Sequence, residues 1–478
     1  MQSPSMKRTE IGKAPPSNEL RLSPVNPTMK RPRSWIGKIL RPCCLISMLK
    51  MGCEASRAYP LGCSTEPPSF TSYETGPFPP GNVSILSMQD LLLVRKLGSG
   101  KFSEVFEASP SINTGLQNLV VVKCLKPVSD RKVRREILIL SHASKLPNCA
   151  RLIGVILPQN FTSDPENGAQ RQMPAIVIKH AGKNARWLCH NRDGTAFLTE
   201  YEIKYYLYHL LIALDALHSK GIMHRDVKPR NILIDTGSLM LVDMGLADFY
   251  LPKTRYNVRV ASRHYKSPEL LIGYEFYDYA IDMWSVGCML AGLLLRIEPF
   301  FRGKDNLDQL GKIVSVLGTS DFLSYCKKCN LDITSDMRKT IAKYTFRNSD
   351  LNGGRRKAWT ELLKEDCPMP SREGLDLLNK LLVYDHEIRW TAKEAMGHKF
   401  FDEVREAVEG EVELQMRRLR REKAENEGSS PVSDFQNFSV EQRNTKEDVV
   451  QPPKQVKRLL SKLLKDRSKS DRKAGTRP

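Results

Sequence analysis

An octapeptide in the middle of the chain combines the residue types that phosphoryl transfer requires. Residues 224–231 read HRDVKPRN, so that a carboxylate precedes an amide by five positions in an expected loop. Asp226 can accept the proton of an attacking hydroxyl, and Asn231 can bind a metal ion. Lys228 can neutralise the transferring phosphoryl group. The octapeptide therefore predicts transfer of a phosphoryl group from a nucleotide to a hydroxyl.

A second acidic motif follows this loop. Asp243 begins Asp-Met-Gly between LMLV and LADFY, and we expect it to hold the magnesium ion of the nucleotide together with Asn231. The segment ends at residues 267–269, Ser-Pro-Glu. We expect Glu269 to form an ion pair with Arg389 that has a structural role and no catalytic one.

An earlier part of the chain contains residues suited to hold phosphates. Residues 97–105 read LGSGKFSEV, and the two glycines allow backbone amides to approach phosphate oxygens. Lys123 follows a Val-rich run that is expected to be the third strand. Glu136 lies thirteen residues later in a segment expected to be helical, and we expect it to form an ion pair with Lys123. The nucleotide-binding set predicted here is Leu97, Gly98, Ser99, Gly100, Lys101, Phe102, Ser103, Glu104, Val105, Lys123, Glu136 and Asp243.

The elements that must position these residues change in type along the chain. Short Val- and Leu-rich runs after residue 90 predict strands, and apolar residues at spacings of three and four after Glu200 predict helices. We therefore expect an α+β fold with a strand-rich first lobe at about 90–180 and a helical second lobe at about 181–401. Residues 1–89 are expected to be a disordered basic extension, and residues 402–478 a charged tail that starts with a helix-prone segment.

Composition narrows the class of protein. The chain has 478 residues, a formal net charge of +20 and 41% hydrophobic residues, which favours a sizeable core and anionic partners. No apolar run has the length of a membrane helix, and the eleven scattered cysteines favour a reducing compartment. We expect the nucleus and cytoplasm, with organelle import through the basic extension as the alternative. The basic stretch from Lys454 is typical of nuclear localisation, nucleic-acid binding, membrane contact or a solvated helix.

The text between the motifs resembles the catalytic alpha subunit of casein kinase II, within the eukaryotic protein kinases. LVRKLGSGKFSEVFEA, GIMHRDVKPRNILID and YDYAIDMWSVGCMLAG carry this resemblance, which spans about residues 90–401. It implies a two-lobed, constitutively active serine/threonine kinase that uses Mg²⁺ with ATP or GTP. By match to the family, the base of the nucleotide would lie between Val105, Val121, Ile178, Leu233 and Val242.

The resemblance also implies acidic protein substrates. Two basic clusters would receive their carboxylates, one on the helix of Glu136 and one before Ser267. The predicted substrate-binding residues are Arg131, Lys132, Arg134, Arg135, Arg259, Arg263 and Lys266. Solvation of a helix, or binding of phosphate or nucleic acid, is the alternative use of such charges, and we do not expect nucleic acid to be the main ligand.

The sequence departs from the family at several positions. Met244 stands in place of a tryptophan, Lys179 in place of a hinge glutamate and Arg230 in place of a histidine. Residues 158–172 form a polar insert, and residues 60–89 do not match the family's N-terminal brace of the activation loop.

Other readings of the sequence remain open. A pseudokinase scaffold and a proline-directed kinase are the rival functions, and the complete catalytic set argues against the first. The family forms a heterotetramer with a regulatory beta subunit, and Leu93, Phe106 and Val122 match the positions that contact it.

Overall fold

The computed structural model describes residues 76–111, 118–158, 173–184, 198–235, 238–346, 354–365 and 367–426. The chain forms two units, Met1–Cys53 and Glu54–Pro478, and all described residues belong to the second unit. The predictions for the first 75 residues, for most of the polar insert and for the basic tail after residue 426 lie outside the described residues.

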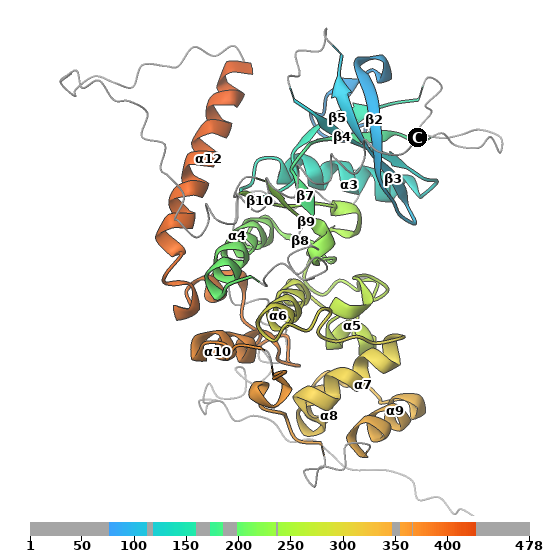
Figure 1. Cartoon of the computed structure of the whole chain (residues 1–478). Coiled ribbons are helices and arrows are strands. Elements are labelled where there is room, and N and C mark those ends of the chain that lie inside the picture. Colours follow the sequence, from blue (N-terminus) through green and yellow to red (C-terminus); the bar gives the residue numbers. More distant parts are fainter. Residues whose placement is uncertain are drawn as a thin grey trace, which may run out of the picture. The chain divides into compact units, whose positions relative to one another are not determined.

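Six strands form one sheet in the order β1-β5-β6-β4-β3-β2 (Figure 1). Antiparallel pairing joins all neighbours except β1 and β5, which run parallel. One helix, α3 (Asp130–Ala143), lies between β4 and β5 in the chain, and its Val133, Ile137 and Leu140 are buried at helical spacing. The strands are β1 (Ile85–Leu86), β2 (Leu91–Ser99), β3 (Ser103–Pro110), β4 (Val120–Leu125), β5 (Leu152–Ile156) and β6 (Ala175–Lys179).

The ordered sheet begins earlier than the sequence indicated. The prediction assigned residues 1–89 to a disordered extension, but β1 pairs with β5 at Ile85–Val155 and Leu86–Ile156. A capped 3-10 helix, Met88–Asp90, then leads into β2. Short strands with few apolar residues give a weak pattern in the sequence, because their pairing depends on a distant partner.

The region from Glu200 onward is mainly helical, as predicted. Two of its long helices, α4 (Glu200–His218) and α6 (Ala280–Leu294), pack against each other. The remaining helices are α5 (Pro268–Ile272), α7 (Asn306–Leu317), α8 (Thr319–Lys328), α9 (Ser335–Phe346), α10 (Arg372–Leu381), α11 (Ala392–Met396) and α12 (Arg405–Asn426). Short strands accompany them: β7 (Lys183–Asn184), β8 (Ile222–Met223), β9 (Ile232–Asp235), β10 (Ser238–Leu241) and β11 (Asp248–Phe249).

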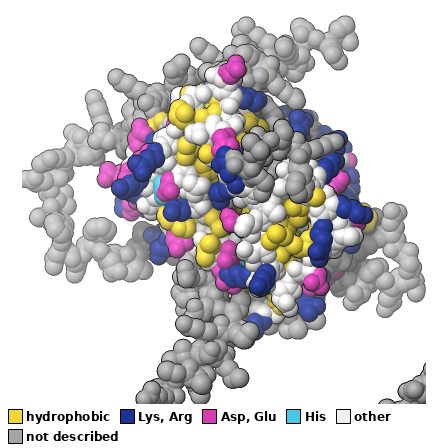
Figure 2. All heavy atoms as spheres, turned by 90° about the horizontal axis from the view of Figure 1, so that it is seen from below, with side chains coloured by type: hydrophobic (Ala, Val, Ile, Leu, Met, Phe, Trp, Pro, Cys, Tyr) yellow, Lys and Arg dark blue, Asp and Glu magenta, His cyan; other side chains and the backbone are white. Residues whose placement is uncertain are grey.

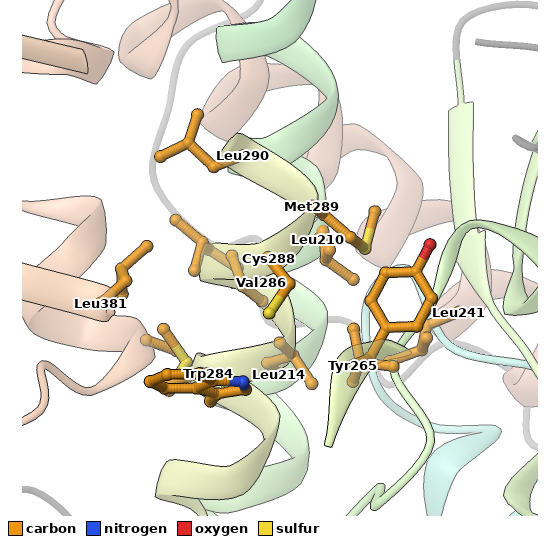
Figure 3. Packing of buried hydrophobic residues seen from close by; sticks show 14 of the residues in the cluster. Leu210, Leu214, Leu241, Tyr265, Trp284, Val286, Cys288, Met289, Leu290 and Leu381 are labelled. Atoms are coloured by element: carbon orange, nitrogen blue, oxygen red, sulfur yellow. The ribbon is translucent and has the colours of Figure 1, made fainter. Parts of the chain in front are cut away.

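The main hydrophobic core surrounds α6 (Figure 3). Fourteen of its fifteen residues are buried. Apolar residues occur on every side of this helix, which is typical of a helix at the centre of a core. Figure 3 shows Leu210 and Leu214 of α4, Leu241 of β10 and Leu381 of α10 around it. This rigid centre supports the loops that follow β8 and β10, which carry the predicted catalytic residues.

The helix α12 extends this core past residue 401. Val404 and Val408 are fully buried in the main cluster, and Val412 packs against it. The helix-prone start of the expected tail is therefore helical over Arg405–Asn426 and packed in its first part. Among the described helices, none is both long and apolar enough to cross a membrane.

Candidate functional site

The glycine-rich loop is the tight turn between β2 and β3. The amide of Gly100 donates to the carbonyl of Ser103 at 2.8 Å, and Lys126 Nζ donates to the carbonyl of Gly100 at 2.9 Å. A side-chain carbon placed on Gly98 would meet no atom within 4 Å. The loop therefore presents open backbone, which suits the approach of phosphate oxygens.

Other residues predicted in the loop have partners within the sheet. Glu104 accepts from Lys96 at 2.7 Å and from Ser99 at 3.3 Å, so its carboxylate is directed along β2. Lys101 and Lys132 place their ammonium groups over the ring of Phe102, at 5.2 Å and 5.8 Å from its centre. Leu97 is 40% exposed.

Lys123 connects the sheet, α3 and the segment after β10. Its Nζ donates to Glu136 Oε1 at 2.6 Å and to Asp243 Oδ1 at 2.7 Å. The predicted ion pair with Glu136 is confirmed. Burial alone would lower the pKa of Lys123, but the carboxylates of Glu136 and Asp243 raise it, so the ammonium stays charged.

The same contacts act on Asp243. Burial would raise the pKa of its carboxyl group, but the ammonium of Lys123 outweighs this and lowers that pKa to about 2. Gly245 lies close to the pair: a side-chain carbon there would come within 3.3 Å of both Asp243 Oδ1 and Lys123 Nζ. Met244, which lies between Asp243 and Gly245 in the chain, is buried in the main core.

Asp226 has a dense set of partners. Ser262 donates to Oδ1 twice, from its amide at 2.9 Å and from Oγ at 2.8 Å. Lys228 Nζ lies 2.5 Å from Oδ2 and 2.8 Å from Ser262 Oγ. Asn231 Nδ2 donates to the backbone oxygen of Asp226 at 2.9 Å and to Oδ2 at 3.2 Å. The carboxylate is thereby held in one orientation.

The loop that carries Asp226 is fixed to α6. The buried carboxylate of Asp282 accepts from the amides of His224 at 2.9 Å and Arg225 at 2.8 Å, and from His218 Nε2 at 2.9 Å. Burial would raise the pKa of Asp282, but the hydrogen bond from His218 lowers it. An anionic side chain on the central helix thus holds the two successive backbone amides that precede Asp226.

Asn231 directly precedes β9, and Asp243 follows the end of the neighbouring strand β10 by two residues. The amide of Val242 donates to the carbonyl of Asn231 at 2.9 Å, which brings the two residues together. Since Nδ2 of Asn231 is used for Asp226, its Oδ1 remains an available acceptor. One carboxylate and one amide oxygen, completed by phosphate oxygens and water, fit magnesium. Among the described residues, no group of three or more His, Cys, Asp or Glu side chains is arranged to bind a metal alone.

The residues predicted to surround the base of the nucleotide come from both the six-stranded sheet and the helical region. Val121 of β4 pairs directly with Ile178 of β6, and Val105 of β3 pairs with Lys123. Leu233 belongs to β9, and Val242 follows β10 and precedes Asp243. All but Val121 are partly exposed.

Three residues predicted to bind substrate are directed inward instead. Arg134, 4% exposed, pairs with Asp130 and donates to the carbonyls of Gly76 at 2.8 Å and Pro77 at 3.2 Å. Arg135 Nη1 donates to Asp248 at 2.7 Å.

The third, Lys266, is 7% exposed, and its ammonium donates to the carbonyls of Val258 and Val260. Burial lowers its pKa. The prediction for these three cations is corrected: their nearest partners lie within the chain.

Four predicted cations remain on the surface. Arg131 and Lys132 are exposed in the first turn of α3, and Arg259 and Arg263 are exposed before Ser267. Arg263 also donates to the carbonyl of Lys304. On the face seen in Figure 2, lysine and arginine side chains are interspersed with aspartate and glutamate. Any preference for acidic ligands therefore depends on such local clusters.

The predicted ion pair of Glu269 and Arg389 is confirmed. It is bidentate, at 2.7 Å and 3.1 Å, and both side chains are fully buried. Arg389 donates further to the carbonyls of Ala280, Val383 and Tyr384, so every part of the guanidinium is satisfied. The pair joins the start of α5 to the segment after α10, consistent with the structural role expected of it.

Sequence reasoning missed Ser262, Asp248 and Asp282. Ser262 completes the contacts of Asp226, and Asp248 accepts from both Arg135 and Arg225. The signal for Asp248 was its place in LADFY, five residues after Asp243. Ser262 and Asp282 lie 36 and 56 positions beyond Asp226, and only the fold brings them near.

The comparison with known families agrees with this geometry. The sequence matches the protein kinase domain family over residues 91–401. The match includes the glycine-rich loop, Lys123, Glu136, Asp226, Asn231, Asp243 and the ion pair of Glu269 with Arg389. Proteins with this domain generally use ATP and magnesium to phosphorylate proteins. Because the match covers most of the chain and the strand-rich and helical parts follow in the expected order, the chain belongs to the protein kinase family.

Proposed function

We propose that this protein transfers the γ-phosphate of ATP, or of GTP as a second donor, to serine or threonine in acidic sequences, in the manner of casein kinase II. The observation that carries the phosphotransferase part is the single orientation of Asp226, fixed by Lys228, Asn231 and Ser262. A kinase fold kept only as a scaffold does not need this arrangement.

The residues divide the work of the reaction. Asp226 receives or orients the proton of the acceptor hydroxyl. Lys228, 2.5 Å from Asp226, is placed to balance charge on the transferring phosphoryl group. Lys123 is held charged by Glu136 and Asp243 for contact with the phosphates. Asp243 and Asn231 Oδ1 would hold Mg²⁺, which neutralises the phosphates during transfer.

The acidic preference is supported by the exposed cations near Asp226. Lys228 contacts Ser262, and Arg263 follows Ser262 directly, so Arg259 and Arg263 lie close in the chain to the catalytic contacts. Both are exposed, and the nearby Arg302 and Lys304 are exposed as well. Carboxylates after the acceptor residue would meet this cluster, with about 1 kcal/mol from each partly exposed contact. Arg131 and Lys132 would receive residues further along.

A charge-reversal experiment tests this proposal. The substitutions Arg259→Glu and Arg263→Glu should lower kcat/KM for a peptide containing SDDE about a hundredfold, and leave that for SAAA nearly unchanged. Lys327→Glu with Lys339→Glu is the matched control, since both lysines are exposed and belong to α8 and α9. An unchanged ratio between the two peptides would refute the acidic preference, and no transfer to any peptide by the wild-type protein would refute the kinase activity.

A regulatory subunit on the first sheet is a further part of the proposal. Of the three matching positions, Leu93 is 40% exposed, whereas Val122 is fully buried. The contact would therefore rest on Leu93 of β2. Co-elution with a casein kinase II beta subunit, and its loss on Leu93→Glu, tests this.

A further inference from the structure

The helix α12 is attached to α4 by carboxylates from its first half. Glu409 Oε1 accepts from Tyr208 at 2.6 Å, and Glu411 Oε2 accepts from Tyr205 at 2.5 Å. Both tyrosine side chains are fully buried in the main core. Two tyrosine–glutamate hydrogen bonds thus join the helices, and they differ in the residues that surround each glutamate.

A buried histidine lies behind Glu411. His209 is 3% exposed, and its Nδ1 lies 3.1 Å from Nδ2 of Asn148, which also donates to the carbonyl of His209 at 3.0 Å. The second contact requires the nitrogen of the amide to face His209, so Nδ1 is an acceptor and the proton of neutral His209 is on Nε2. This Nε2 has no hydrogen-bond partner, and Glu411 Oε2 is 3.6 Å away.

The histidine leads to the metal-binding segment. Asn148 is 2% exposed and has a left-handed backbone with φ 54°. Its carbonyl accepts from the amide of Leu241 at 2.7 Å, and Ala150 donates back to the carbonyl of Leu241 at 2.9 Å. Leu241 ends β10, two residues before Asp243. A continuous series of contacts therefore runs from Glu411 through His209 and Asn148 to this strand end.

We propose that Glu411 is a positioning residue for nucleotide binding, acting through His209 and Asn148 on Leu241 and hence on Asp243. The carboxylate attracts Nε2–H of His209 and keeps the ring against Asn148, whose backbone completes the end of β10. The inference rests on the kinase function proposed above. It makes the C-terminal helix, outside the span matched to the family, part of the support of the nucleotide site.

Three alanine substitutions in the same helix separate this proposal from simple attachment of α12. Glu411→Ala removes the contacts to Tyr205 and His209. Glu409→Ala removes the equivalent contact to Tyr208, and Glu406→Ala changes an exposed residue. Glu411→Gln retains an acceptor for Tyr205 and guards against loss of the helix. Tyr205→Phe removes only the tyrosine contact of Glu411.

The first measurement is hydrogen exchange in the full-length protein. Glu411→Ala should accelerate exchange of the amides of Leu241 and of residues 148–150 about fivefold, the effect of losing one modest hydrogen bond. Glu411→Gln should do so to a smaller extent. Glu409→Ala, Tyr205→Phe and Glu406→Ala should change it less than about twofold. Equal acceleration by Glu409→Ala, or none by Glu411→Ala, would overturn the proposal.

The second measurement is kinetic. Glu411→Ala should raise KM for MgATP about fivefold while KM for the peptide stays within twofold, because the contacts reach Asp243 and not the exposed cations. A rise in peptide KM alone would contradict the proposal. If the wild-type protein transfers no phosphate, the proposed function fails, and hydrogen exchange together with MgADP binding by calorimetry still decides the role of Glu411.

Discussion

Replacing Arg134 by alanine should destabilise the protein and leave substrate preference intact. The sequence grouped Arg134 with Arg131 as a receptor for acidic substrates, but the structure gives the two residues different surroundings. Arg134 is buried and holds residues 76–78 against α3, whereas Arg131 is exposed. The pair of variants therefore separates a structural arginine from one that is available to a substrate.

The size of the effect follows from the contacts that are lost. Arg134 donates to two backbone carbonyls, pairs with Asp130 and lies 5.1 Å from the centre of the Phe78 ring. Hydrogen bonds from a charged donor contribute about 1 to 2 kcal/mol each, and the ring contact about 0.5 to 1 kcal/mol. Since such contributions are not additive, the total cost should be about 2 to 4 kcal/mol.

Thermal and urea unfolding of the two alanine variants measure this cost. Arg134→Ala should lower Tm by about 4 to 8 °C, and Arg131→Ala by less than about 1 °C. In peptide assays the order should reverse: Arg131→Ala raises KM for SDDE about fivefold and Arg134→Ala does not, apart from its stability. A stable Arg134→Ala protein with a weakened acidic preference would refute the reasoning and restore the interpretation from sequence.

Four further outcomes follow from the site. Lys123→Met should reduce phosphotransfer at least a hundredfold while far-UV circular dichroism is unchanged, because Glu136 and Asp243 lose their shared cation. Glu269→Gln should cost about 3 to 5 kcal/mol in urea unfolding, because it leaves Arg389 as a buried unpaired charge. The pKa of Asp243 is lowered from 3.8 to about 2, so the charged carboxylate stabilises the fold above pH 3.8, and this stabilisation is lost as the pH falls towards 2. The difference in free energy of unfolding between wild type and Lys123→Met should therefore shrink from pH 3.8 to about pH 2. Protein treated with phosphatase should remain active, because Ser262 of the segment between Asp243 and Glu269 contacts Asp226 directly through its own amide and hydroxyl.

The sequence could predict the part of the site that lies within short motifs. Asp226, Lys228 and Asn231 share one loop, and their mutual contacts follow from their spacing once the loop forms. Lys123 and Glu136 were also predictable, because a lysine in a strand after a glycine-rich loop and a glutamate in the following helix are a known motif pair. The fold class followed in the same way, from the change of hydrophobic period near Glu200.

The directions of the basic side chains could not be read from their number alone. In α3, Arg134 precedes the buried residues Ile137 and Leu138 by three and four positions, and Arg135 precedes the buried Ile139 by four. Helical phase thus turns both arginines towards the interior, a signal that the sequence contained. Lys266 offered no such signal, since its partners are carbonyls of an irregular segment.

The position of Asp243 shows why several distant contacts are needed at one residue. Its backbone is left-handed, with φ 68°, which costs about 1 kcal/mol for a residue other than glycine. Three contacts oppose relaxation: Lys123 on its side chain, Asn231 on the amide of the preceding Val242, and Asn148 on Leu241. These come from β4, the catalytic loop and the segment after α3. A conformation that is unfavourable in isolation is thus maintained by three separate elements, and loosening any one should be felt first as weaker binding of the metal and nucleotide.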